Sequence, residues 1–400
     1  MTAHNSSVAV LFHRLGPYHL ARIGAAARRL TVVAVESSGV DKTYAWDKVA
    51  AAGPYQRLTL FEQADAQTLP AAEVVRRTAE VLDQVKPAVV VVPGWGDAFA
   101  LAASQWCLQN RVPTVLMSES TAWDEPRQAW REAVKRQVVG LGSAALVGGT
   151  PHQAYIEQLG LPARRVFLGY DVVDNEYFVS ATRAVRAQAD ALRVRHGLPG
   201  RYFLASNRFI SKKNLPRVLE AYARYRSQAA GPWNLVLLGD GALRPDLMRL
   251  VASLGLADSV QLPGFKQYPE LPVYYGLAGA FIHASTSEQW GLVVNEAMAS
   301  GLPVLVSNRC GCAMNLVQEG DNGFSFDPEN VGQLAGLMTK IAAPDFPLAA
   351  FGAASQNRIA EWGPERFGAG LQQAVECALR TGPVRPTLLQ RAVLALLLRR

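Results

Sequence analysis

Short apolar runs alternate with stretches of helical periodicity along nearly the whole chain. Such runs predict buried strands, and apolar residues that recur every three or four positions predict amphipathic helices. The predicted strands are Val8–Phe12, Leu30–Val35, Ala88–Val92, Thr114–Met117, Ala144–Val147, Tyr202–Ala205, Asn234–Leu238, Val260–Leu262, Ala280–His283, Val304–Val306 and Gly323–Phe326. The predicted helices are Tyr18–Arg29, Ala71–Gln84, Arg127–Leu141, Leu215–Arg226, Leu243–Leu254, Leu292–Ala299 and Val331–Ile341. This alternation predicts βαβ units with parallel sheets, an α/β fold.

The chain is longer than one ordinary hydrophobic core requires. Its 400 residues predict two domains of roughly 150–200 residues each. A charged helical stretch, Ala181–Arg195, and the breaker "HGLPGR" after it place the boundary between Gly169 and Arg201. We expect Rossmann-like, doubly wound domains at 1–175 and 201–365, a linker helix at 176–200, and a C-terminal helix and tail at 366–400. Two such domains facing each other would form a central cleft, because ligands bind beyond the carboxyl ends of parallel strands.

The composition is that of a globular chain with ample core, since half of the residues are hydrophobic and 18% are charged. Lys and Arg outnumber Asp and Glu, 40 to 33, which gives a net charge of +7. This excess favours anionic partners such as phosphates, nucleic acid or an acidic membrane surface. The alternative is an ordinary solvated basic surface.

The four cysteines, Cys107, Cys310, Cys312 and Cys377, form no CxxC pair and have no histidine close in sequence. They indicate reduced thiols of a cytosolic protein rather than a zinc site. The apolar run Val8–Phe12 is too short for a signal peptide, and no stretch reaches the ~18 apolar residues needed to span a bilayer. We therefore expect a cytoplasmic protein, either free or peripheral on the inner face of the membrane.

Two glutamates, Glu288 and Glu296, interrupt the otherwise small and apolar stretch "STSEQWGLVVNEAMASG". Gly291 marks a turn into a helix, Leu292–Ala299, whose first backbone N–H groups and positive dipole end suit an anion. Carboxylates are acceptors that suit sugar hydroxyls. The stretch therefore favours a sugar joined to a nucleotide through a diphosphate. The alternative makes Glu288 a charge that complements the helix dipole and Glu296 part of a solvated face.

The sequence "EQWGLVVNEAMASGLPVLVS" resembles the signature of the retaining, GT-B-fold glycosyltransferases of family four: Glu, seven residues, Glu, then Ala-Met-Ala-x-Gly-x-Pro-Val. The resemblance implies that Glu288 contacts the transferred sugar and Glu296 the ribose hydroxyls. It also implies that the backbone of Gly291, Leu292 and Val293 binds the donor diphosphate.

Arg208 and Lys213, in "ASNRFISKKNL", follow the first strand of the second half and are candidates to clamp a diphosphate. The stretch is similar to the family's Gly-Arg-x-x-x-x-Lys-Gly, but it has Asn207 before the arginine and Asn214 after the lysine. "LLGDGAL" resembles the family's Gly-x-Gly turn. "LPGF", which ends at Phe265, resembles the segment whose backbone meets the base. "CGCAMNLVQEGDNGFSFDP" resembles a further family stretch, so the likeness covers nearly all of the second half.

The first half carries fewer such features. In "FHRLGPYHLAR", Gly16 stands in the turn where the family brings backbone close to the donor. His13, Tyr18 and His19 are candidates to line the acceptor side of the cleft, or else serve as caps and surface groups. Glu119, in "PTVLMSES", stands where many relatives carry a histidine near the sugar. We interpret it as a residue that addresses the acceptor.

The sequence carries no HExxH, acidic DxD-like or GxGxxG motif, so we expect neither a metal ion nor a nicotinamide cofactor. The tail "RPTLLQRAVLALLLRR" is basic at its ends and apolar between them. It is either a terminal helix packed across the domains or an interfacial anchor for an acidic membrane.

These features together favour a retaining hexosyltransferase that uses a nucleotide-diphosphate sugar. A UDP-sugar is the first choice of donor and GDP-mannose the second. The acceptor would be a saccharide or lipid-linked saccharide, and nucleic acid is not an expected partner. The alternatives are a nucleotide-sugar epimerase or hydrolase on the same fold, and a non-catalytic protein that binds nucleotide sugars.

Overall fold

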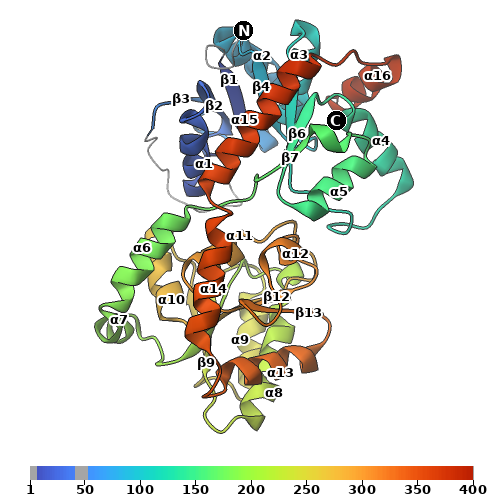
Figure 1. Cartoon of the computed structure of the whole chain (residues 1–400). Coiled ribbons are helices and arrows are strands. Elements are labelled where there is room, and N and C mark those ends of the chain that lie inside the picture. Colours follow the sequence, from blue (N-terminus) through green and yellow to red (C-terminus); the bar gives the residue numbers. More distant parts are fainter. Residues whose placement is uncertain (1–6, 41–52, 400) are drawn as a thin grey trace. The chain divides into compact units, whose positions relative to one another are not determined.

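The computed structural model describes residues 7–40 and 53–399. The chain forms two compact units (Figure 1). The first unit contains the residues up to Val173 and those from Pro364 onward, and the second unit contains Asp174–Gly363. The last part of the chain thus belongs to the same unit as the first part.

The first unit is a sheet of seven parallel strands in the order β3-β2-β1-β4-β5-β6-β7. Its strands are β1 (Val8–Phe12), β2 (Val32–Ser38), β3 (Gln56–Phe61), β4 (Val89–Pro93), β5 (Thr114–Ser118), β6 (Ala144–Val147) and β7 (Val166–Leu168). Its helices are α1 (Pro17–Ala27), α2 (Ala71–Val85), α3 (Ala98–Asn110), α4 (Ala129–Val139), α5 (Thr150–Gln158), α15 (Pro364–Thr381) and α16 (Leu388–Leu397).

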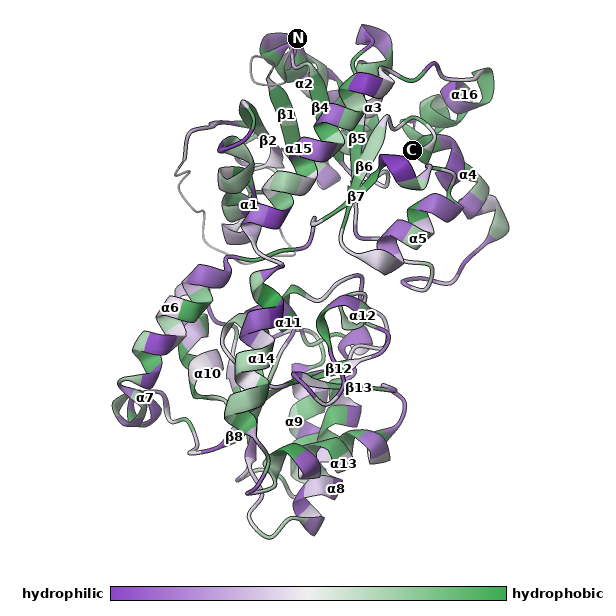
Figure 2. Ribbon diagram, viewed as in Figure 1, coloured by the Kyte–Doolittle hydropathy of each residue, from purple (hydrophilic) through white to green (hydrophobic). Residues whose placement is uncertain are grey.

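Helices cover both faces of this sheet. Alternate residues of a strand point to opposite faces, so neighbouring residues of one strand belong to different cores. Val8 and Val10 of β1 belong to the core formed with α1 and α15, whereas Ala9 and Leu11 belong to the core formed with α2, α3 and α5. Strands buried on both faces need apolar residues at every position, and Figure 2 shows hydrophobic residues along them.

The second unit is a sheet of six parallel strands in the order β10-β9-β8-β11-β12-β13. Its strands are β8 (Tyr202–Ser206), β9 (Asn234–Leu238), β10 (Val260–Gly264), β11 (Ala280–His283), β12 (Val304–Ser307) and β13 (Gly323–Phe326). Its helices are α6 (Asn175–Arg186), α7 (Ala189–His196), α8 (Leu215–Gln228), α9 (Arg244–Ser253), α10 (Leu271–Leu277), α11 (Leu292–Ala299), α12 (Ala313–Leu316), α13 (Val331–Ala342) and α14 (Leu348–Ala360).

Each unit is doubly wound, so the expected α/β fold class is confirmed. The strand order reverses between β1 and β4 in the first unit and between β8 and β11 in the second. Loops diverge at such a point and leave a crevice at the carboxyl ends of the strands. In the second unit, the loops at this crevice are those that carry Lys213 and Glu288.

Two segments are arranged differently from the sequence expectation. Residues 176–200, expected to form one linker helix, contain the two helices α6 and α7, and α6 packs on α10 and α11 of the second unit. The C-terminal segment forms α15, which packs on α1, β6 and β7, and α16, which packs on α3 and α4. Within the described ranges, no helix has both the length and the apolar character needed to cross a membrane.

Candidate functional site

The loop after β8 is fixed by Asn214, which follows the 3₁₀-helix η4 (Ser211–Lys213). Asn214 has a left-handed backbone, with φ of 59°, and asparagine tolerates this conformation better than other residues with a Cβ. Its buried side-chain amide donates to the carbonyl oxygens of Ala284 at 3.1 Å and Pro328 at 2.8 Å. Asparagine therefore adopts the conformation that a glycine would adopt here, and it also ties Lys213 to the end of β11.

The Lys213 ammonium donates a hydrogen bond to Oε2 of Glu288, although the two residues are 75 positions apart. The ammonium of Lys212 lies 3.5 Å from Oε1 of Glu288, and the Ser285 hydroxyl donates to Oε2 at 3.2 Å. Nε2 of His283 lies 3.5 Å from the same oxygen. The side chains of Lys213 and Glu288 are largely buried, so this ion pair is shielded from water.

Burial opposes ionisation of Glu288, but the His283 hydrogen bond and the charges of Lys213 and Lys212 outweigh it. Together they hold the pKa of Glu288 well below its usual range. Burial lowers the pKa of His283 despite the neighbouring carboxylate, so its imidazole is neutral. The site thus presents a permanently charged carboxylate whose compensating cations come from another loop.

The Glu288 loop is held by a short parallel ladder with the loop after β12. The backbone N–H of Glu288 donates to the Arg309 carbonyl at 3.2 Å, and the Gly311 N–H donates to the Glu288 carbonyl at 3.0 Å. The Cys312 N–H donates to the Trp290 carbonyl at 3.2 Å. These three backbone hydrogen bonds fix the loop, and with it the position of the Glu288 carboxylate, before any ligand binds.

Gly291 begins α11 with φ of 105°, a conformation that side chains disfavour. A Cβ at this position would also lie 3.3 Å from Nε2 of His283. Leu292 and Val293 form the first turn and are half-buried. The first N–H groups of a helix have no partner within the helix, so this turn can bind an anion beside Glu288 and Lys213.

Glu296 is only 1% exposed, which excludes the alternative of a solvated face. Its Oε2 accepts a 2.5 Å hydrogen bond from the hydroxyl of Tyr275. Burial, together with the charge of Glu296, raises the pKa of Tyr275 well above its ordinary value. Contact between Glu296 and a ribose stays a prediction, and Tyr275 is a neighbour that the sequence motifs did not indicate.

The remaining donor-side candidates, Arg208 and Phe265, are both exposed. Arg208 lies on the same loop as Lys213, next to Phe209, whose N–H donates to the Asp240 carbonyl at 2.8 Å. The Gly239 N–H donates to the Gly264 carbonyl at 3.0 Å. The loops after β8, β9 and β10 are thus joined through their backbones. The cations that contact Glu288 are those of Lys213 and Lys212.

Three candidates of the first unit lie around the turn after β1. The N–H of Gly16 donates to Nδ1 of His19 at 3.2 Å, so His19 caps α1. Burial, aided by the charge of Arg22, lowers the pKa of His19 to about 3, and the imidazole is neutral. His13 is held by a 3.0 Å contact between its Nδ1 and Oγ of Ser37. His19 thus serves as a cap of α1, and its place on the acceptor side stays a prediction.

Tyr18 is half-buried in the first turn of α1. The same turn is fixed by Glu36 of β2, whose fully buried carboxylate accepts a 2.9 Å hydrogen bond from the Leu15 N–H. Arg57 donates to the other oxygen of Glu36 at 2.8 Å. The backbone that precedes Gly16 is thus set by a buried ion pair.

Glu119 follows β5, and its charge acts on the fully buried Asp171, which follows β7. A buried carboxyl group beside a second carboxylate favours its protonated form. Burial first, and then the charge of Glu119, raises the pKa of Asp171 well above 3.8. The Arg22 guanidinium lies 4.0 Å from Asp171, but its Nε donates to the Val172 carbonyl. Glu119 therefore belongs to a carboxyl pair that its own sequence stretch did not indicate.

Replacing Asp171 with asparagine is expected to change how stability depends on pH. Asp171 has a folded pKa above its unfolded value, so its contribution is fully present below pH 3.8 and is lost as pH rises toward the folded value. Asparagine keeps a hydrogen-bond donor and cannot ionise. The free energy of unfolding of Asp171→Asn, relative to the wild type, should therefore increase as the pH rises above about 4 in urea titrations. Parallel pH profiles would contradict the raised pKa of Asp171.

The described residues contain no group of three or more His, Cys, Asp or Glu side chains that could hold a metal ion. All four cysteines are buried and unpaired with one another. Burial and the charge of Glu288 raise the pKa of Cys310, beside the glutamate loop, above its ordinary range. That thiol is therefore protonated.

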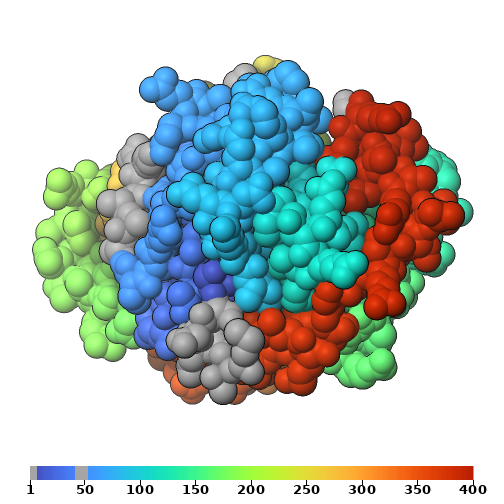
Figure 3. All heavy atoms as spheres, turned by 90° about the horizontal axis from the view of Figure 1, so that it is seen from above, coloured from blue at the N-terminus to red at the C-terminus, as the bar shows by residue number. Residues whose placement is uncertain are grey.

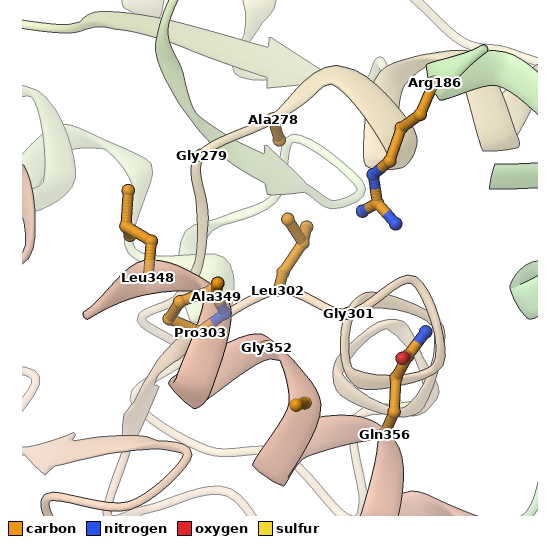
Figure 4. A pocket seen from close by; sticks show the side chains of 11 residues that line it. Arg186, Ala278, Gly279, Gly301, Leu302, Pro303, Leu348, Ala349, Gly352 and Gln356 are labelled. Atoms are coloured by element: carbon orange, nitrogen blue, oxygen red, sulfur yellow. The ribbon is translucent and has the colours of Figure 1, made fainter. Parts of the chain in front are cut away.

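A separate pocket of about 360 Å³ lies at the amino ends of β11 and β12 (Figure 4). It is lined by Arg186, Ala278, Gly279, Gly301, Leu302, Pro303, Leu348, Ala349, Gly352, Ala353 and Gln356. The Arg186 guanidinium donates to the carbonyl oxygens of Gly276 in the last turn of α10 and Ser300 just after α11, so its donors are used within the fold. Glu288 follows the carboxyl end of β11, so the pocket lies at the opposite end of the strands from Glu288.

Residues 190–358 match the family described as Glycosyl transferases group 1. The α-D-kanosaminyltransferase of Streptomyces kanamyceticus is 27% identical over 231 residues, which is 57% of each chain. The D-inositol 3-phosphate glycosyltransferase of Thermobispora bispora is 28% identical over 361 residues, covering 83% of this chain and 81% of that protein. The chain thus spans little more than half of the kanosaminyltransferase.

Solved glycosyltransferase structures share the fold of the chain. HepE of Anabaena, in complex with UDP and glucose, has a TM-score of 0.69 at 17% identity and covers 92% of this chain and 98% of its own. Sucrose-phosphate synthase of Thermosynechococcus elongatus has a TM-score of 0.72 with the same identity and coverage. Residues 190–358 of the chain thus resemble the glycosyl transferases group 1, and the chain has the GT-B fold.

Proposed function

We propose that the protein is a retaining hexosyltransferase that moves a sugar from a nucleotide-diphosphate sugar to a hydroxyl of a saccharide or lipid-linked saccharide. One observation carries this proposal. Lys213 and Glu288, from the two loops that diverge at the β8/β11 crevice, meet close to the first turn of α11. A helix start, a cation and a fixed carboxylate are the groups that a diphosphate joined to a sugar requires.

The proposed roles follow from charge. The backbone N–H groups of Gly291, Leu292 and Val293 bind the diphosphate, and Lys213 and Arg208 stabilise the charge that develops on it. When no nucleotide sugar is bound, the positive charge of Lys213 is compensated by Glu288. A bound diphosphate would share that cation and let the Glu288 carboxylate accept hydrogen bonds from the sugar. Glu296 is assigned to the ribose, and the backbone around Phe265 to the base.

In the proposed step, the bond between the anomeric carbon and the diphosphate oxygen breaks, and the acceptor oxygen bonds to that carbon on the same face. The acceptor proton passes to the departing phosphate oxygen, so the products are the glycoside and the nucleoside diphosphate. No enzymic base and no metal ion is invoked. On the first unit, Gly16 is assigned to the donor, and His13, Tyr18, His19 and Glu119 to the acceptor side.

A UDP-sugar is the preferred donor, supported by the solved neighbour HepE, which holds UDP-glucose in one of its structures. GDP-mannose is the second choice. It is supported by the GDP-mannose:cellobiosyl-diphosphopolyprenol α-mannosyltransferase of Komagataeibacter xylinus, 33% identical over 135 residues. The name of that relative also supports a lipid-linked acceptor, and we place the reaction in the cytoplasm or on its membrane face.

A thermal-shift panel of UDP-sugars and GDP-mannose tests the proposal. Ligands that bind only the folded state raise the unfolding temperature. We expect stabilisation by one nucleotide class and its loss in Lys213→Met, whereas Lys340→Met, on α13, serves as a matched control that keeps the response. No shift with any nucleotide sugar would contradict the proposal.

The best binder is then tested with and without saccharide acceptors. Transfer requires an acceptor, whereas an epimerase or hydrolase converts the donor alone to its epimer or free sugar. Tight binding with no turnover in any mixture would instead indicate a binding protein. The two lysines beside Glu288 can stabilise a diphosphate leaving group, which favours an enzyme over a protein that only binds nucleotide sugars.

A further inference from the structure

Helix α16 has two apolar faces, and only one of them is covered. Leu394 packs with Leu101, Val138 and Leu141 in a small core to which Val393, Leu397 and Leu398 also contribute. The Gln390 side-chain amide donates to the carbonyl oxygen of Gln137 at the end of α4. The helix is thus a fixed part of the first unit, and it packs on α3 and α4 of that unit rather than across the domains.

The outer face of α16 is apolar and exposed. Leu388 is 87% exposed, Leu389 59% and Leu396 60%. Leu388, Ala392 and Leu396 recur at every fourth position, so they share one side of the helix. Figure 3 shows this last part of the chain, in red, at the outer surface. An apolar stripe of this kind on a helix that is already anchored indicates a second partner.

The neighbouring helix α4 extends the same kind of surface. Its Trp130 is 56% exposed, and the Arg131 guanidinium lies 5.3 Å from the centre of that indole ring. Arg136 on α4, Arg391 on α16 and Arg399 just beyond α16 are exposed as well. We call these side chains, with the three leucines, the α4–α16 surface: Leu388, Leu389, Leu396, Trp130, Arg131, Arg136, Arg391 and Arg399.

Cations dominate the charge of this surface. Residues 382–399 contain three arginines and no Asp or Glu. The one acidic residue of α4 is Glu132, and it accepts a hydrogen bond from Tyr155 and lies 3.2 Å from the Lys135 ammonium. Exposed leucines and a tryptophan among arginines suit the interface of a bilayer with anionic headgroups, where arginines meet phosphates and apolar groups enter the acyl boundary.

We propose that the α4–α16 surface docks the protein on an anionic lipid bilayer. A second copy of the chain is a less suitable partner, because a two-fold contact would bring the same arginines against one another. The proposal does not depend on sugar transfer. Its test therefore measures binding alone, and its failure would leave the proposed function intact.

The experiment is vesicle flotation of the full chain with phosphatidylcholine alone and with about 30% phosphatidylglycerol added. We expect binding to the anionic vesicles only. The triple variant Leu388→Ser/Leu389→Ser/Leu396→Ser, which leaves the packed face intact, should lower the bound-to-free ratio at least about tenfold. Arg391→Glu/Arg399→Glu should lower it similarly on anionic vesicles.

Matched controls change exposed apolar residues elsewhere. Val194→Ser and Met248→Ser alter two exposed side chains of the second unit and should leave flotation unchanged. Equal flotation of the triple variant and the wild type would overturn the proposal. So would a dimer in light scattering, without vesicles, that the triple variant abolishes, because the covering partner would then be a second copy.

Discussion

Glu288→Gln is expected to lower kcat for sugar transfer by at least about a thousandfold, because the fixed charge that we propose contacts the transferred sugar is lost. The amide is close in size to the carboxylate, so the loop and its backbone ladder should persist. The substitution also leaves Lys213 without its carboxylate partner in a largely buried position. We therefore expect an additional loss of roughly 3 kcal/mol in the free energy of unfolding.

A double-mutant cycle separates the two effects. Lys213→Met removes the charge that Glu288→Gln leaves unbalanced, so the double variant should recover stability relative to either single variant. It should not recover activity, since the diphosphate contact and the sugar contact are then both absent. Unfolding free energies come from urea titration, and rates come from the transfer assay. If the double variant regained turnover, the assigned roles would be wrong.

Gly239→Ala is expected to cost at least about 3 kcal/mol of unfolding free energy. A Cβ at Gly239 would lie 1.9 Å from the carbonyl oxygen of Asn207, and the residue has φ of 127°. The neighbour is backbone, so the loop that carries Arg208 and Lys213 would have to move. We expect weaker nucleotide-sugar binding in the same variant.

Gly255→Ala is the matched control for this steric effect. Gly255 also has a positive φ, 67°, but nothing lies within 4 Å of the position of its Cβ. This variant should lose only the conformational cost, about 1–2 kcal/mol, and should bind donor like the wild type. Equal losses in the two glycine variants would mean that the contact with Asn207 relaxes freely.

The sequence predicted most strands of the two sheets, because strands buried on both faces appear as uninterrupted apolar runs. Strands β1, β6, β9, β11 and β13 have the predicted bounds. It missed β3, whose residues alternate between polar and apolar at the edge of the sheet, and the three-residue edge strand β7. Helix α3 was also missed, because it is buried on nearly all sides and shows no polar face.

The sequence motifs predicted which residues form the site, but they did not predict the contacts between those residues. The glutamate pair, the lysine and the helix start were all identified as candidates, and the structure joins Lys213 to Glu288. It could not be inferred that Tyr275 holds Glu296, or that the charge of Glu119 acts on Asp171, because such pairs depend on how distant loops approach in the fold. Lys212, adjacent to a chosen residue, could have been found from its charge.

The placement of α15 in the first unit has a consequence for biosynthesis. Phe367, Leu371 and Val375 fill the core against β1 and β4, so the first unit lacks one covering layer until residues beyond 364 have been made. The second unit is a single continuous segment and is complete by Gly363. On the ribosome, the later half of the polypeptide should therefore acquire its native packing before the earlier half does.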